Sequence, residues 1–247
     1  MSQASPRRTS AARPDATQES FVTEVRRARA IAPLYGQMFA ALSLQVALLL
    51  VEPDPWIKHP INMVMSVWLA RIIHGITGRR SDFWVAAGLG VTPALLDLAL
   101  PWETAGVAVD FAKSLLWMGF PAFLGMRLFP SLFRAREISH HELLGAVGLY
   151  VLIGMAFANV HETIFLFDPN GIHFAFLAPG EEPNYGNFLY FSFVTLATLG
   201  FGDVAPVHPV AQLGVVIESV LGLMFMAIMV ARLVSLHTSS QGQPPSS

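Results

Sequence analysis

The sequence contains no cysteine, and only 13% of its 247 residues are charged. The absence of cysteine excludes disulfide bonds, thiolate catalysis and cysteine-ligated metals. A soluble domain typically has about a quarter charged residues. Here 53% of the residues are hydrophobic, and the mean hydropathy is +0.52. The composition therefore predicts a membrane protein.

Net charge is also small, at −2, which gives no indication of nucleic-acid binding. The first thirty residues are polar and Arg-rich, without the short apolar core of a signal peptide, so we expect no cleaved leader. The polar composition of residues 1–17 predicts disorder. The mixed basic and apolar pattern of residues 21–32 predicts either a basic amphipathic helix on the membrane surface or a solvated helical lead-in. Residues 238–247 form a polar tail.

Six apolar segments are long enough to cross a bilayer. Eighteen helical residues span roughly 27 Å, which is close to the ~30 Å of a hydrocarbon core. The second segment is the least typical of a membrane span, because Arg71 and His74 lie within it. The six segments are Leu34–Val51, Pro60–Ile76, Phe83–Leu100, Ala105–Phe129, Leu143–Phe167 and Ala211–Leu236.

Basic residues favour one orientation of these segments. They gather before the first segment, in the connections that follow the second and fourth, and near the end of the sixth. The opposite connections contain Lys58 as their only basic residue. Because positive residues prefer the cytoplasmic side, we expect both termini in the cytoplasm, with a bacterial inner membrane as the location.

The connection after the fifth segment contains a second kind of apolar run, from Phe188 to Leu199. At about 12 residues this run is too short to cross, and it fits a re-entrant half-helix. Non-helical backbone at membrane depth survives only where protein buries it or where it lines a watery path. A half-helix followed by Gly200-Phe201-Gly202 therefore predicts a pore.

Such a pore can select K⁺ if backbone carbonyls replace the hydration shell of the ion. Pointing carbonyls at a common axis requires positive φ at some residues, which Gly200 and Gly202 adopt without steric penalty. We expect the ion sites at the carbonyls of Thr198, Leu199, Gly200 and Phe201 and at the Thr198 hydroxyl. The carbonyls of one chain cannot surround an ion, so we expect four chains to assemble around the pore.

Residues 195–206, Thr-Leu-Ala-Thr-Leu-Gly-Phe-Gly-Asp-Val-Ala-Pro, resemble the potassium-channel signature Thr-x-x-Thr-Val-Gly-Tyr-Gly-Asp-x-x-Pro. The resemblance extends from about Leu143 to Leu236 and implies an outer helix, a pore helix, a filter and an inner helix. It also implies K⁺ as the transported ion, a homotetramer in membrane lipid, no cofactor and no catalysed reaction.

The resemblance also assigns residues to gating. Gly222 lies twenty residues after Gly202, at the position of a hinge glycine, with close packing against the pore helix as the alternative. Met226, one turn further, is expected near the fourfold axis. Glu218 resembles an acidic residue of bacterial two-helix pore modules. We expect it to hydrogen-bond backbone behind the filter or the pore helix or, alternatively, to line the cavity.

The filter departs from the signature in its supporting residues. Leu199 replaces Val and Phe201 replaces Tyr, and the pore helix has Phe191 in place of Trp, so we expect aromatic packing behind the filter. At the position of Val194, some members of the family have a Glu that pairs with the filter Asp. We expect Tyr190 to reach Asp203 instead. Thr195 is the first threonine of the signature and also belongs to the filter support.

The first four segments predict a helical bundle attached to the pore. Arg71, Asp97, Asp110 and Lys113 are expected to be mutual partners within it, or alternatively a proton or ligand sensor. His161 and Glu162 are expected at the outer interface, with pH sensing as the alternative. Residues 140–142, His-His-Glu, are expected in a solvated linker and lack the spacing of a zinc protease.

The sequence thus predicts an all-α membrane protein with six transmembrane helices, a re-entrant pore helix and a selectivity-filter loop in a tetrameric pore. The rival functions are a non-selective or Na⁺-conducting channel and a non-conducting regulatory membrane protein. The predicted divisions are 1–32 as the N-terminal segment, 33–130 as the bundle, 131–142 as the linker, 143–237 as the pore domain and 238–247 as the tail.

The fourth segment lacks the basic residue at every third position that a voltage sensor requires, since it offers only Asp110, Lys113 and Arg127. We therefore predict a shallow conductance–voltage relation in planar bilayers. A steep relation that carries several gating charges per subunit would contradict this prediction.

Overall fold

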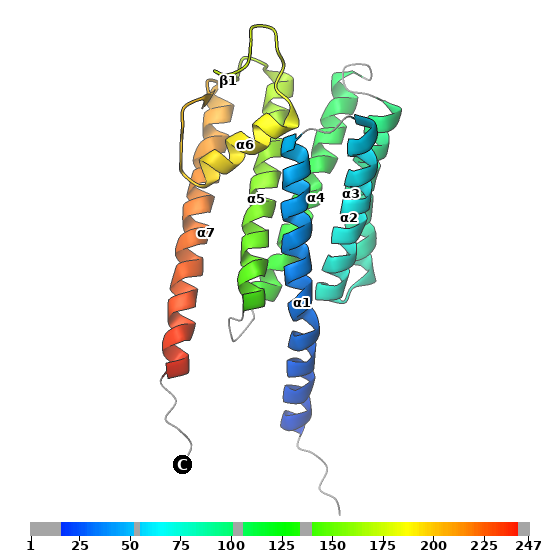
Figure 1. Cartoon of the computed structure of the whole chain (residues 1–247), viewed down its shortest axis with the longest axis vertical. Coiled ribbons are helices and arrows are strands. Elements are labelled where there is room, and N and C mark those ends of the chain that lie inside the picture. The colour runs from blue at the N-terminus through cyan, green and yellow to red at the C-terminus, as the bar shows by residue number, and fades with distance from the viewer. Residues whose placement is uncertain (1–15, 52–54, 101–105, 134–139, 242–247) are drawn as a thin grey trace, which may run out of the picture.

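The structure is a computed structural model that describes residues 16–51, 55–100, 106–133 and 140–241. These residues form mainly helices, with one pair of short strands (Figure 1). The elements are α1 (Ala16–Val51), α2 (Pro55–Thr77), α3 (Arg80–Ala99), α4 (Val107–Phe133), α5 (His140–Phe167), β1 (Ile172–Phe174), α6 (Tyr185–Leu196), β2 (Val204–Pro206) and α7 (Pro209–Gln241).

Helices α1 to α4 form the expected bundle, and α5 to α7 form a second group beside it (Figure 1). Helices α1 and α4 both pack on α5, which joins the two groups. The short helix α6 slants across the upper end of the second group and packs on α5, α7 and α1. Large buried apolar side chains such as Met38, Leu69, Phe120 and Leu152 fill the space between the helices.

Five described helices are long and apolar enough to cross a membrane: Ala30–Val51, Arg80–Ala99, Val107–Leu132, His140–Phe167 and Pro209–Arg232. These helices confirm five of the six predicted spans. Helix α2 forms over the remaining predicted segment, but it does not reach the same apolarity. The charged and titratable residues of this helix are Lys58, His59, Arg71 and His74.

The N-terminal helix agrees with one of the two predicted alternatives. Helix α1 runs without interruption from Ala16 to Val51, so residues 21–32 are a helical lead-in to the first span and not a separate surface helix. Pro33 lies inside this helix. A proline removes one helical hydrogen bond, which membrane helices tolerate when neighbouring groups satisfy the freed carbonyl. Residues 1–15, predicted to be disordered, lie outside the described residues, as do 242–247 of the tail.

Two further predictions need correction. Residues 140–142 form the first turn of α5 and are therefore helical, while 134–139 of the predicted linker lie outside the described residues. The all-α prediction missed the antiparallel pair β1–β2, in which Ile172 lies opposite Pro206 and Phe174 opposite Val204. Each strand has three residues, too few for a period-two pattern to show in the sequence.

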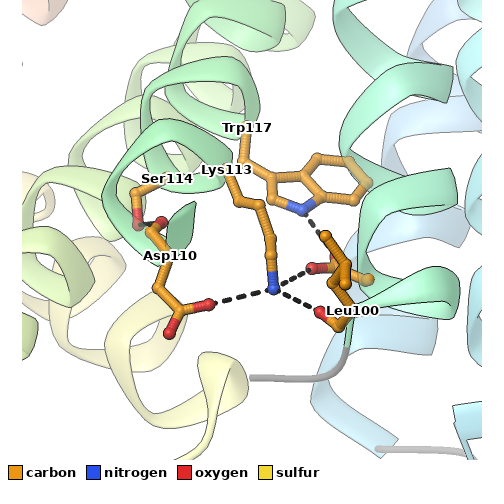
Figure 2. A network of polar contacts seen from close by, with 6 residues as sticks. Leu100, Asp110, Lys113, Ser114 and Trp117 are labelled. Atoms are coloured by element: carbon orange, nitrogen blue, oxygen red, sulfur yellow. Dashed lines mark hydrogen bonds and ion pairs between the residues drawn. The ribbon is translucent and has the colours of Figure 1, made fainter. Parts of the chain in front are cut away.

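A buried lysine joins α3 and α4 within the bundle (Figure 2). Lys113 Nζ lies 2.9 Å from Asp110 Oδ1 and 3.6 Å from Asp97 Oδ1, and it donates to the carbonyl oxygen of Leu100 at 2.7 Å. Trp117 Nε1 donates to Asp97 Oδ2 at 3.0 Å. Three of the four predicted partners therefore meet, and each carboxylate lies beside the lysine charge.

Arg71 does not belong to this group, because its side chain is exposed on α2. A different arginine forms the second ion pair of the bundle. Arg127 Nη2 on α4 donates to the buried Asp82 Oδ1 on α3 at 2.6 Å. The described ion pairs of the bundle therefore form two separate groups along α3 and α4. Lys113 lies beside two carboxylates in one group, and Arg127 beside one in the other.

We predict that Lys113→Met destabilises the protein by about 3–5 kcal/mol, because it leaves two buried carboxylates without their counter-charge. Thermal unfolding of the purified protein in detergent measures this loss. Arg71→Met is the matched control, since it removes an exposed charge and should change stability by less than about 0.5 kcal/mol. Equal stability of the two variants would show that the buried group contributes nothing.

Candidate functional site

Helix α6 is the predicted half-helix. Asn184 caps its first turn by accepting a hydrogen bond from Asn187 N at 2.9 Å, and the Asn187 side chain accepts one from Asn184 N at 2.9 Å. This reciprocal cap starts the helix at Tyr185, three residues before the predicted apolar run. The helix ends at Leu196, because Thr198 adopts a φ of 56° that a right-handed helix cannot contain.

The five residues after Ala197 have an alternating backbone. Thr198, Gly200 and Gly202 have φ values of 56°, 56° and 81°, whereas Leu199 and Phe201 between them do not have positive φ. Thr198 is the one non-glycine residue with positive φ in the described part of the chain. A β-branched residue in this region is strained by roughly 1–3 kcal/mol, and such strain persists only where surrounding contacts impose it.

Contacts at both ends impose this conformation. At its start, Thr198 N donates to the Thr195 carbonyl at 2.9 Å and Leu199 N to the Val194 carbonyl at 2.9 Å. At its end, Tyr190 Oη donates to Asp203 Oδ2 at 2.6 Å. This is the contact expected between Tyr190 and Asp203. It raises the pKa of the Tyr190 phenol, so the phenol remains a donor at neutral pH.

The outer loop holds the same end of the segment. Ala175 N donates to the Asp203 carbonyl at 2.8 Å, directly beside the pairing of β1 with β2. Val207 N and His208 N both donate to the carbonyl of Gly171, at 2.8 and 3.0 Å. The short sheet therefore attaches the residues after Gly202 to the loop between α5 and α6.

Behind α6, one carboxylate connects three helices. Glu218 on α7 is fully buried, and its Oε2 lies 2.8 Å from His161 Nε2 on α5. Its Oε1 accepts a hydrogen bond from Ser192 on α6, and the Ser192 hydroxyl also lies 2.7 Å from the Gly154 carbonyl oxygen. The ring of His161 packs on Phe191, with ring centroids 4.8 Å apart.

These contacts bear on two predictions. The carboxylate of Glu218 contacts the pore helix, as expected, but its partners are the side chains of Ser192 on α6 and His161 on α5. His161 is fully buried and does not lie at the outer interface. Phe191 has the expected aromatic environment, although its neighbour is a histidine ring. Val194 and Thr195 are buried, and both use their carbonyls to hold the start of the alternating segment.

Residues 153–239 match the model of a protein family described as an ion channel. The chain contains an ion-channel domain. The match runs from the middle of α5 nearly to the end of α7 and includes α6 and the alternating segment. It agrees with the resemblance to potassium channels in residues 195–206. A comparison with curated proteins finds no match.

Within the ion-channel domain, Gly222 lies against the end of α6. A Cβ atom at this position would lie 2.3 Å from the carbonyl oxygen of Leu196, two residues before Thr198. The structure therefore has the close packing that was the alternative to a hinge. Met226, one turn further along α7, is 54% exposed. Its predicted place beside an axis stays a prediction.

Sequence reasoning missed the residues that join the helices of the domain to one another. Ser192 was not singled out, although it is the one serine in an apolar run. Asn159 was also missed. Its Nδ2 donates to Tyr185 Oη at 2.9 Å and so ties α5 to the first residue of α6. Single polar residues in otherwise apolar segments were the available signal, but nothing in the sequence pairs them.

We predict that Gly222→Ala destabilises the protein by about 1–3 kcal/mol, because the added methyl group meets a backbone oxygen that cannot rotate away. Gly214→Ala on the same helix is the control, since its nearest neighbour, a carbon of His161, would lie at an ordinary 3.5 Å. Thermal unfolding in detergent compares the two variants. Equal stability of the two variants would show that close packing does not require glycine at position 222, and it would favour the hinge.

Proposed function

We propose that the chain is a subunit of a K⁺-selective channel, with its selectivity filter at Thr198, Leu199, Gly200, Phe201 and Gly202. The observation that carries this proposal is the alternating sign of φ along these residues. Alternation turns successive peptide planes so that the N–H groups face one side and the carbonyl groups face the other. A row of carbonyl oxygens on one side is the ligand set that replaces the hydration shell of K⁺.

The surrounding helices support the same function. The C-terminal end of α6 lies directly before the filter, so the negative end of its helix dipole favours a cation there. The Thr198 hydroxyl adds a further oxygen at the start of the carbonyl row. Asp203 follows the row and is fixed by Tyr190, which keeps a carboxylate beside its outer end.

The exposed surface of the single chain supports a homotetramer in membrane lipid. Leu199 and Phe201 are 58% and 64% exposed, although both are large and apolar. Helix α7 exposes apolar side chains on several sides, among them Val216, Val220 and Leu223. Four copies around an axis would cover the inner side of α7 and the filter, and lipid would cover the remainder. K⁺ ions would occupy the axis.

We also propose six membrane crossings, with both termini in the cytoplasm and the protein in the bacterial inner membrane. Helix α2 has 23 residues, enough to span about 34 Å, and it packs along α3. Placing α2 across the membrane assigns every basic cluster of the connections to one side. Asn62 and Ser66 of this helix are buried in the bundle. The exposed Arg71 lies six residues before the end of the helix, from where a long basic side chain can reach the interface.

We predict that the purified protein in planar bilayers reverses its current near the K⁺ equilibrium potential. The shift is about 60 mV per tenfold K⁺ gradient, because a tenfold ratio is ~1.4 kcal/mol and 100 mV is ~2.3 kcal/mol per charge. A reversal potential that follows the Na⁺ gradient would identify the Na⁺-conducting rival. Absence of any current would favour the non-conducting regulatory protein.

We further predict that Thr198→Ala weakens block by Ba²⁺, because it removes a ring of hydroxyl oxygens from the ion path. Thr163→Ala is the matched control, since the Thr163 hydroxyl donates to the Asn159 carbonyl within α5. Single-channel recording at fixed K⁺ concentration measures the block. If Ba²⁺ blocks both variants as it blocks the unmodified protein, Thr198 does not face the ions.

A further inference from the structure

A cavity of about 240 Å³ lies between the bundle and the ion-channel domain. Each helix from α1 to α6 contributes at least one residue to its wall. The apolar part of the wall includes Leu49, Phe120, Pro121 and Met155. The cavity therefore lies where the two groups of helices meet, beside the start of α6.

Several polar groups of the wall lack partners. Gln45 is 2% exposed, and its Oε1 has no hydrogen-bond partner among the described residues. Asp97 Oδ1 also accepts no hydrogen bond there, although Lys113 Nζ lies 3.6 Å away. A buried acceptor without a donor destabilises the folded protein. A ligand that donates hydrogen bonds would satisfy these acceptors.

The charges around the cavity are not balanced. Asp97 and Glu162 line it, and Asp110 joins them through Lys113, which gives three carboxylates. Lys58 in the wall and Lys113 behind it are the two lysines of this group, and His59 also lines the cavity. With the carboxylates and lysines ionised and histidine counted as neutral, the group has one excess negative charge. Glu162 forms no ion pair in the described part of the chain.

The size and wall of the cavity distinguish an organic ligand from a metal ion. No three metal-ligating side chains of the His, Asp and Glu type gather anywhere among the described residues. A cavity of about 150 Å³ accommodates benzene, so 240 Å³ has room for an aromatic ring with a short chain. Trp117 and Tyr185 add two aromatic side chains, which attract cations at their ring faces.

We propose that this cavity binds a small organic cation, a protonated amine with an apolar body. The ammonium group would donate to Glu162 and Gln45, and the apolar body would lie against Phe120 and Met155. The site also touches the ion-channel domain, because Tyr185 is the first residue of α6 and is held by Asn159 of α5. Binding does not require conduction, so the proposal stands or falls independently of K⁺ selectivity.

Isothermal titration calorimetry of the full chain in detergent tests the proposal with 2-phenylethylammonium as the probe. The control ligand is 2-phenylethanol, which has the same ring and chain with a neutral hydroxyl group. We expect the amine to bind at least roughly tenfold more tightly than the alcohol, because hydrogen bonds to charged groups are the stronger ones. No binding of the amine, or equal binding of the two, would overturn the proposal.

Two isosteric variants locate the site. Glu162→Gln should weaken binding of the amine roughly tenfold or more, because it removes the unpaired carboxylate. Glu182→Gln, an identical change in the exposed outer loop, should leave binding unchanged. Gln45→Glu should tighten binding, so it tests the site even if the first variant does not fold. Unchanged affinity in both cavity variants would place the amine elsewhere and refute the assignment.

Discussion

The buried carboxylate of Glu218 determines where the filter segment lies. It is a charged residue in the middle of an apolar helix, and the cost of a charge in the bilayer is several kcal/mol unless a partner satisfies it. Its partners are His161 of α5 and Ser192 of α6. These contacts fix how far α7 and α6 slide along α5. Ser192 lies six residues before Thr198, so the same contacts set the depth at which the alternating backbone begins.

The strained backbone of Thr198 needs this rigid backing. A positive φ at a β-branched residue costs roughly 1–3 kcal/mol, and the two hydrogen bonds from residues 198 and 199 to the end of α6 offset it. Gly222 brings α7 to the other side of the same turn, against Leu196. The outer end is held separately, by Tyr190 and the short sheet. The proposed filter is thus fixed at both ends, while its middle has no hydrogen bond to the rest of the described chain.

Local signals predicted the helices of the ion-channel domain and one contact within it, from Tyr190 to Asp203, but not its short strands or the contacts between its long helices. The twelve-residue length of α6 and the glycines at 200 and 202 follow from residues close together in sequence. Glu218 and His161 lie 57 residues apart, and Arg127 and Asp82 lie 45 apart. Their pairing depends on which helices are neighbours, and the spacing of apolar residues along the chain does not indicate this. Arg71 was wrongly grouped with Lys113 for the same reason, since both are basic residues in apolar segments, but Arg71 is exposed and Lys113 is buried.

The contacts of the bundle favour the predicted shallow response to voltage. Moving one elementary charge through 100 mV gains about 2.3 kcal/mol. Removing one partner of a buried ion pair costs about 3–5 kcal/mol. The fully buried Lys113 is held by Asp110 and Asp97, so the field gains less than these contacts contribute. Arg127 is paired with Asp82 but is 34% exposed, so its pair contributes less. A route by which a bound ligand acts on the pore does not depend on the field. The cavity beside Glu162, which reaches from these helices to the first residue of α6, is where the structure offers such a route.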